Sequence, residues 1–181
     1  MAMPRVFISI PVGNALGLEP LYRDLSRIRG VKTSPTFQLH ITLCFIGDVP
    51  DERVEEIGEI VNTSVKGVRG GRITLKGVGC FPNPKRPRIV YAGIETDIPL
   101  EQLSNEIRRR LSSAGIPFDE KPFKPHITVG RIQGQPDLTM TINKYRTTEF
   151  ASFISRDVMV MGSELSPAGA KHTILRACDL E

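Results

Sequence analysis

The sequence predicts an α+β fold built from two similar lobes, because one pattern of strands and helices occurs twice. The stretches FQLHITLC (37–44) and FKPHITVG (123–130) share Phe, His, Ile and Thr in matching positions, 86 residues apart. Glycines that end a helix, Gly30 and Gly115, repeat at almost the same offset. A constant offset across several elements is typical of an internal duplication. We therefore expect residues 1–181 to form one bilobal domain with an internal repeat of about 86 residues.

The elements of the first half follow from composition and periodicity. RVFISIPV is rich in β-branched and aromatic residues, which favour a strand. Leucines at helical spacing before Gly30 predict a helix. Asp51 and Glu52 stand in the first turn of a second helical stripe, where they favour the helix dipole. The expected elements are a strand at 5–12, a helix at 17–29, a strand at 38–47 and a helix at 51–66.

The second half contains the clearest helix, because 98–114 carries five apolar residues on one face. We expect Asp97 to cap its start, Gly115 to end it, and Arg108–Arg110 to lie on its exposed side. The other expected elements are strands at 72–79, 88–95 and 124–132, a short helix near 137–146, and two or three strands over 149–178 with a turn at 166–169.

Composition indicates a globular protein but does not indicate its function. With 40% hydrophobic and 24% charged residues, the 181-residue chain can bury a core. A net charge of +4 is weak evidence for anionic partners. Three widely spaced cysteines argue against a disulfide scaffold, and no apolar stretch reaches the ~20 residues that cross a bilayer. We expect a monomeric cytoplasmic protein that does not bind membranes.

The repeated phrase places two polar residues on one side of each strand. Side chains at i and i+2 share a face, so His40 and Thr42 point one way. Leu39, Ile41, Leu43 and Phe45 are expected on the opposite side, in the core. His126 and Thr128 repeat the arrangement. If a pseudo-two-fold axis relates the lobes, the two His–Thr faces meet across a shared cleft.

Two opposed histidines can act as a general acid and a general base, because the ordinary histidine pKa near 6.5 allows one ring to be protonated and the other neutral. Neither role requires a metal or a covalent intermediate. Threonine hydroxyls can donate hydrogen bonds to phosphoryl oxygens. A strained cyclic phosphodiester is a suitable substrate for two histidines and two threonine hydroxyls arranged in this way. The residues alone leave open which histidine is the acid.

These motifs resemble the paired H-x-T-x motifs of the two-histidine (2H) phosphoesterases. More closely, the chain resembles the RNA 2′,3′-cyclic phosphodiesterases, long called 2′-5′ RNA ligases. The similarity extends over nearly the whole chain. It comprises the stretches RVFISIPV, HITLCFIGDVP (40–50), FPNPKRPRIVYAGI (81–94), FKPHITVGR (123–131) and SELSPAGAKHTIL (163–175).

The resemblance implies two antiparallel sheets lining a central cleft, with helices packed outside and the lobes interleaved along the chain. It implies hydrolysis of an RNA terminal 2′,3′-cyclic phosphate to a 2′-phosphomonoester, without metal or cofactor. His40 would be the proton donor and His126 the proton acceptor. Thr42, Thr128 and Arg131 would bind the substrate phosphate. Strict alternation places Arg131 on the face opposite His126, so it reaches the phosphate only if the strand bulges near Gly130.

One departure from the family pattern is His172, which stands where an aromatic residue is common. We interpret it as a surface or strand histidine, since a three-histidine zinc site has little support. The basic loop at 81–88 fits a solvated turn as well as an RNA contact. Two alternatives to hydrolysis stay open: 2′-5′ RNA ligation by the reverse proton transfers, and a nucleotide- or RNA-binding module without turnover.

Overall fold

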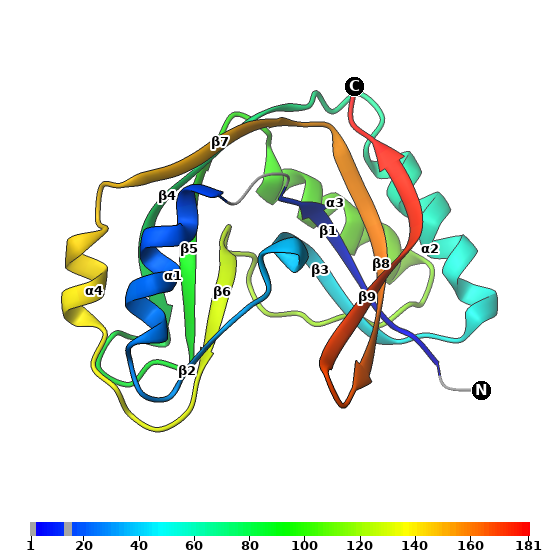
Figure 1. The fold of residues 1–181 in the computed structure, drawn as a ribbon. Helices are drawn as coiled ribbons and strands as arrows, with labels where there is room; N and C mark the ends of the chain where they lie inside the picture. The colour runs from blue at the N-terminus through cyan, green and yellow to red at the C-terminus, as the bar shows by residue number, and fades with distance from the viewer. Residues whose placement is uncertain (1–2, 13–15) are drawn as a thin grey trace.

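The structure, a computed structural model, describes residues 3–12 and 16–181. These residues form nine strands and four α-helices. Their arrangement in space is drawn in Figure 1. In chain order they are β1 (Arg5–Pro11), the 3₁₀ turn η1 (Leu16–Leu18), α1 (Glu19–Ser26), β2 (Val31–Thr33), the 3₁₀ turn η2 (Thr36–Gln38), β3 (His40–Asp48), α2 (Asp51–Ser64), β4 (Gly71–Phe81), β5 (Ile89–Thr96), α3 (Leu100–Ser113), β6 (Ile127–Ile132), α4 (Thr139–Lys144), β7 (Glu149–Ser155), β8 (Asp157–Ser166) and β9 (Gly169–Asp179).

The strands form two antiparallel sheets. Sheet A has the order β3-β1-β8-β9, and sheet B has the order β2-β6-β5-β4-β7. Helices α2 and α3 pack on sheet A, whereas α1 and α4 lie against sheet B. The predicted α+β class, with two antiparallel sheets and helices outside them, is confirmed. Buried residues of both sheets join one continuous core, which supports our proposal of a single bilobal domain.

The two halves of the chain exchange helices. Helix α1 follows a strand of sheet A but packs beside β2 of sheet B. Helix α3 follows a strand of sheet B but packs on β3 of sheet A. The C-terminal hairpin β8–β9 then returns to pair with β1. Each sheet therefore combines segments that are distant in sequence, and the lobes do not correspond to the sequence halves.

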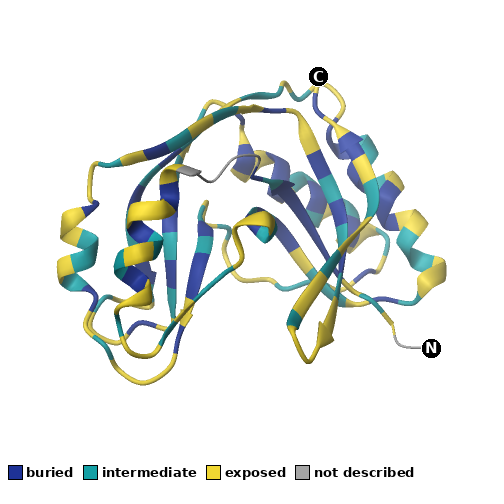
Figure 2. Cartoon of the chain, in the orientation of Figure 1, coloured by how far each residue is buried: buried dark blue, intermediate teal, exposed yellow. Residues whose placement is uncertain are grey.

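Burial follows this layering. The middle strands of both sheets are buried, and the helices expose their outward sides (Figure 2). Across the described ranges, no helix is both long enough and apolar enough to pass through a bilayer.

Each motif strand contains a β-bulge at the same place. In sheet A, Ser9 lies opposite Thr42 and Ile8 lies opposite Cys44, so Leu43 is skipped. In sheet B, Tyr91 lies opposite Thr128 and Val90 lies opposite Gly130, so Val129 is skipped. The skipped residues are 86 positions apart, as are the motif histidines. The duplication therefore includes a backbone irregularity as well as the motif residues.

The carbonyl of each bulged residue is hydrogen-bonded outside the motif strand pair. The Oγ of Ser104, buried on α3, donates to the carbonyl of Leu43 at 2.6 Å. In the other lobe, the backbone N–H of Ser34 donates to the carbonyl of Val129 at 2.8 Å. A buried carbonyl without a partner is costly, so these contacts stabilise the bulges.

We expect Ser104→Ala to lower the free energy of unfolding by about 1–3 kcal/mol, because it leaves the buried Leu43 carbonyl unpaired. Urea denaturation would measure this change. Ser113→Ala is the matched control, since that exposed hydroxyl on the same helix bonds only to the carbonyl of Arg109. Equal stability of the two variants would show that Ser104 does not stabilise the bulge.

One expectation for this helix is wrong. Pro99, not Asp97, occupies the N-cap position of α3, and no side chain caps the helix there. Instead the Oγ1 of Thr96 accepts a hydrogen bond from the N–H of Ile98 just before the helix. Sequence analysis does not predict the short strand β2, because three residues are too few to show a period-two pattern.

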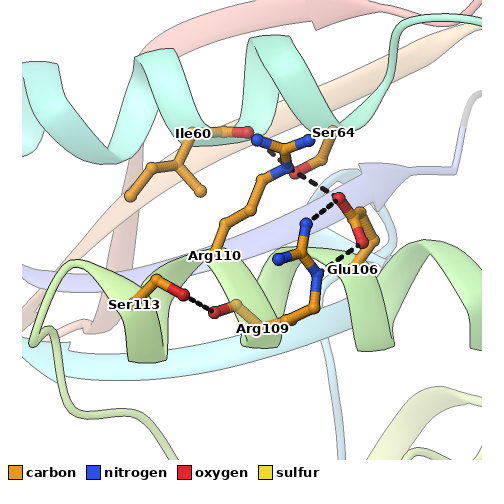
Figure 3. A network of polar contacts seen from close by, with 6 residues as sticks. All are labelled: Ile60, Ser64, Glu106, Arg109, Arg110 and Ser113. Atoms are coloured by element: carbon orange, nitrogen blue, oxygen red, sulfur yellow. Dashed lines mark hydrogen bonds and ion pairs between the residues drawn. The ribbon is translucent and has the colours of Figure 1, made fainter.

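The three consecutive arginines of α3 do not share one environment. Arg109 and Arg110 both bond to Glu106 at the surface (Figure 3), with distances of 2.8 Å and 2.7 Å to its Oε1. The hydrogen bond from Arg109 is the main reason that the pKa of Glu106 is lowered to about 2. Arg108 and Arg110 are both half-buried, and the guanidinium of Arg108 lies 5.8 Å from the ring centre of Phe118. The prediction of an exposed side chain is therefore correct for Arg109 and only partly met by Arg110, whereas Arg108 packs on the segment after the helix.

Candidate active site

The two motif histidines are held in the same way. His40 is the first residue of β3, and His126 immediately precedes β6. The Nδ1 of each lies near the carbonyl two residues earlier, 2.8 Å from the oxygen of Gln38 and 2.6 Å from that of Lys124. A carbonyl oxygen only accepts, so Nδ1 carries the hydrogen. Each Nε2 is thereby left for exchanging a proton with a substrate.

The motif threonines lie on the same faces as the histidines, which we call the inner faces of the sheets. Ile41 and Ile127, between each His and Thr, are fully buried in the core. Thr42 and Thr128 are half-buried. Alternation along the strand therefore correctly predicts both His–Thr pairs up to the bulge.

Beyond the bulge the alternation reverses, and the prediction that Phe45 lies in the core is wrong. Phe45 is opposite Phe7 on β1 and is 39% exposed, while the preceding Cys44 is buried. The extra residue at Leu43 shifts the strand by one position, which turns Phe45 to the inner face. The bulge has no residue signature that sequence periodicity could detect.

The same reversal places Arg131 on the inner face of sheet B. Arg131 lies opposite Ile89, and Thr128 lies opposite Tyr91, two residues further along β5. Residues directly opposite each other project from the same face, and so do residues i and i+2 of one strand. Arg131 and Thr128 therefore share a face, although strict alternation would separate them. Sequence analysis required a bulge near Gly130 for Arg131 to reach the phosphate, and the strand has that bulge.

Rings from other strands of the same sheet lie beside each imidazole, and sequence analysis did not predict these contacts. The ring centre of His40 is 4.9 Å from that of Phe7 and 5.6 Å from that of His172. His126 has the corresponding contacts with Phe81 at 5.0 Å and Tyr91 at 5.5 Å. Each imidazole thus has two ring neighbours, which restrict its orientation.

The position of His172 requires a strongly coiled sheet. His172 is a half-buried strand residue, as expected, and it lies opposite Ser163 on β8. By register, that row of residues is at the Arg5 end of β1, whereas His40 lies at the Pro11 end. A flat sheet would keep these two corners far apart. Twist and coiling accumulate over four strands and bring the rings into contact.

The electrostatic environment of His40 favours its neutral form. Burial is the main cause of a lowered pKa for His40, and the positive charges of His172 and His126 lower it further. The hydrogen bond to the Gln38 carbonyl acts in the opposite direction. Burial also lowers the pKa of His172. Both rings near β1 therefore lose their protons at a lower pH than an exposed histidine does.

A titration of the imidazole Cε1–H signals by NMR tests this arrangement. We expect the midpoint for His40 in the free protein to fall below the ordinary value of 6.5, because its protonated form is poorly solvated. The protein has three histidines, so single substitutions assign the signals. A midpoint at or above 6.5 for His40 would contradict the burial shown by the structure.

The two motif histidines are close enough to sense each other's charge, since protonated His126 lowers the pKa of His40. Strands β3 and β6, which carry them, are in contact across the two sheets. Within the described part of the chain, no three His, Cys, Asp or Glu side chains converge as a metal site. The arrangement can transfer one proton to a reacting group and remove one from another.

A bilobal fold that presents a His–Thr pair from each sheet has the architecture of the two-histidine phosphoesterases. Residues 8–91 and 94–171 match the family model described as LigT like phosphoesterase. The chain therefore belongs to the LigT-like phosphoesterase family, as the sequence resemblance indicated.

Curated relatives and solved structures agree with this assignment. The chain is 34% identical to the RNA 2′,3′-cyclic phosphodiesterase of Archaeoglobus fulgidus over 95% of its own length and 98% of the relative. It is 31% identical to the enzyme of the same name from Thermotoga maritima, covering 98% and 96% of the two chains. The structure of TT0787 from Thermus thermophilus has a TM-score of 0.78 at 27% identity, covering 97% of both chains. Apo LigT of Escherichia coli shares the fold, with a TM-score of 0.72 at 19% identity and 99% coverage of both chains.

Proposed function

We propose that this protein hydrolyses the 2′,3′-cyclic phosphate at RNA ends to a 2′-phosphomonoester, acting as a monomer without a metal ion. The names of relatives that match over nearly the full chain support the reaction and the RNA substrate. The observation that carries the proposal is the matched pair of imidazoles, in each of which the hydrogen bond of Nδ1 to a backbone carbonyl assigns proton exchange to Nε2. Both come from one chain, so one copy suffices.

In the proposed reaction, the Nε2 of His126 removes a proton from water as its oxygen attacks phosphorus. The bond from phosphorus to the ribose 3′ oxygen breaks, and the Nε2 of His40 gives its proton to that oxygen. His126 ends protonated and His40 ends neutral, so exchange with solvent restores the starting state. The family resemblance supports the assignment of His40 as the acid. The anionic phosphate would counteract the effect of burial on the pKa of His40.

Thr42, Thr128 and Arg131 complete the proposed phosphate site. All three share the inner faces with the histidines, as the strand registers show. The threonine hydroxyls would donate to the non-bridging oxygens, and the guanidinium would offset their negative charge. The arginine differs from the threonines because its charge is permanent at any working pH.

The experiment is incubation with a short RNA that ends in a 2′,3′-cyclic phosphate, in excess EDTA. We expect ring opening with a 2′-phosphate product, identified by chromatography against both phosphate isomers. A strict requirement for added divalent metal, or a 3′-phosphate product, would overturn the mechanism. Adding excess RNA with a 5′-hydroxyl tests 2′-5′ ligation, for which water at ~55 M is the competitor. Tight nucleotide binding without any product would instead indicate a binding module.

A further inference from the structure

The two motif histidines differ in the kind of ring beside them. His126 is flanked by Phe81 and Tyr91, which are neutral at physiological pH. His40 is flanked by Phe7 and by a second imidazole, His172. The phosphoesterase reaction proposed above uses only two histidines for proton transfer, so the third is not a proton donor or acceptor in it.

Permanent positive charge is also distributed unequally. On the sheet B side, the Nζ of Lys124 lies 5.5 Å from the ring centre of Phe81, and Arg131 shares the inner face with Thr128. On the inner face of sheet A, the permanent cation in the same row as His172 is Arg5. Its Nε is 3.7 Å from the carboxylate of Asp48. An anion between the sheets would therefore meet fixed cations on one side and titratable imidazoles on the other.

The surroundings of His172 contain few competing charges. Ser163 faces it from β8, Phe7 from β1 and His40 from β3. The amide of Gln38 on η2 bonds to the Ala170 carbonyl, and Arg5 is already paired with Asp48. On its own strand, the flanking Lys171 and Thr173 alternate to the other face, and Asp157 and Asp179 form the far end of the hairpin. The charged or titratable groups on the sheet B side are His126, Lys124 beside Phe81, and Arg131 on β6.

We propose that His172, in its imidazolium form, binds a phosphate group of the RNA end and so determines substrate affinity. The inference rests on the proposed function, because the ligand is the same RNA end. His172 is half-buried beside Phe7 and His40, which favours the neutral ring until an anion arrives. Binding then takes up a proton, and affinity falls as the pH rises. The phosphate is either the cyclic one or the next internucleotide phosphodiester, since an imidazole 5.6 Å from His40 can approach both.

His172→Phe, His172→Gln and His172→Lys separate charge from shape. The Phe variant keeps a ring against Phe7 and His40 but cannot carry charge, whereas Lys carries it at every working pH. We expect the KM of the Phe and Gln variants to rise about tenfold at pH 5.5 and to match the wild-type value at pH 8, with kcat nearly unchanged. The Lys variant should keep a low KM at both pH values. Ile174→Ala, on the same face two residues away, is the control and should leave KM unchanged.

Two substrates distinguish the possible phosphates. A 2′,3′-cyclic mononucleotide has only the cyclic phosphate, and a dinucleotide with the same end adds one internucleotide phosphodiester. Raised KM for both substrates assigns His172 to the cyclic phosphate, and raised KM for the dinucleotide alone assigns it to the next. A pH-independent loss of kcat in all three variants would overturn the proposal, because it indicates only a structural role.

Calorimetric binding of 2′-AMP provides a readout that does not depend on turnover. We expect the proton uptake on binding to be smaller in His172→Phe than in the wild type, measured in buffers of different ionisation enthalpy. Equal uptake and equal affinity in the two proteins, together with unchanged KM for the dinucleotide, would exclude phosphate binding by His172. If 2′-AMP binds in this way but cyclic phosphates are not opened, the proposed reaction fails while the role of His172 stands.

Discussion

His40→Ala and His126→Ala are each expected to reduce kcat by about 10²- to 10⁴-fold, the contribution of a positioned general acid or base. Each substitution removes the Nε2 that exchanges a proton with the reacting oxygen. The double variant should be only slightly slower than the slower single variant, since the two groups act in one concerted step. Steady-state hydrolysis of a cyclic mononucleotide in EDTA measures all three. Activity within tenfold of the wild type in either single variant would contradict the proposed acid–base pair.

Folding has to be controlled in these variants, because both rings also pack against neighbours. His40→Ala removes contacts with Phe7 and His172, and His126→Ala removes contacts with Phe81 and Tyr91. We expect a loss of about 1 kcal/mol in stability, which leaves the protein folded at 25 °C. Phe7→Leu is a matched control, since it disturbs the packing of His40 without removing a proton-transfer group.

The part of the site that depends on local strand geometry could be predicted from the sequence. His40 and Thr42 share a face because they are two residues apart, and no bulge intervenes. The duplication could also be predicted from the sequence, because the two motifs keep the same residues at matching positions. The predicted helices and most strand boundaries also follow local periodicity.

The part that depends on the backbone register could not be predicted. The bulge at Leu43 moves Phe45 from the core to the inner face, and an ordinary Leu gives no sign of it. The contact between His40 and His172 depends on the coiling of a sheet whose strands are distant in sequence. Sequence analysis found the departure at position 172 but not its neighbour in space.

Arg131→Met is expected to lower kcat/KM by about 10²- to 10³-fold, the typical cost of removing one charge-stabilising donor from a transition state. The effect should be similar from pH 5.5 to pH 8, because guanidinium does not titrate in this range. This constant loss distinguishes Arg131 from His172, whose contribution is expected only at low pH. Arg131→Lys should recover part of the loss, since it restores a charge but not two parallel donors.

Phe45 provides the control for Arg131, because it occupies the equivalent place after the bulge in the other lobe. Phe45→Met alters an inner-face side chain at the same backbone irregularity without removing a charge, so kcat/KM should change by less than about threefold. Comparable losses in Phe45→Met and Arg131→Met would mean that both residues act by maintaining the bulged strands. A large loss of kcat/KM in Arg131→Met alone, with unchanged stability, would place the guanidinium at the phosphate. The bulge would then serve catalysis by turning Arg131 to the inner face. The duplicated bulge would then turn a different side chain to the inner face in each lobe, the cation of Arg131 in one and the apolar ring of Phe45 in the other.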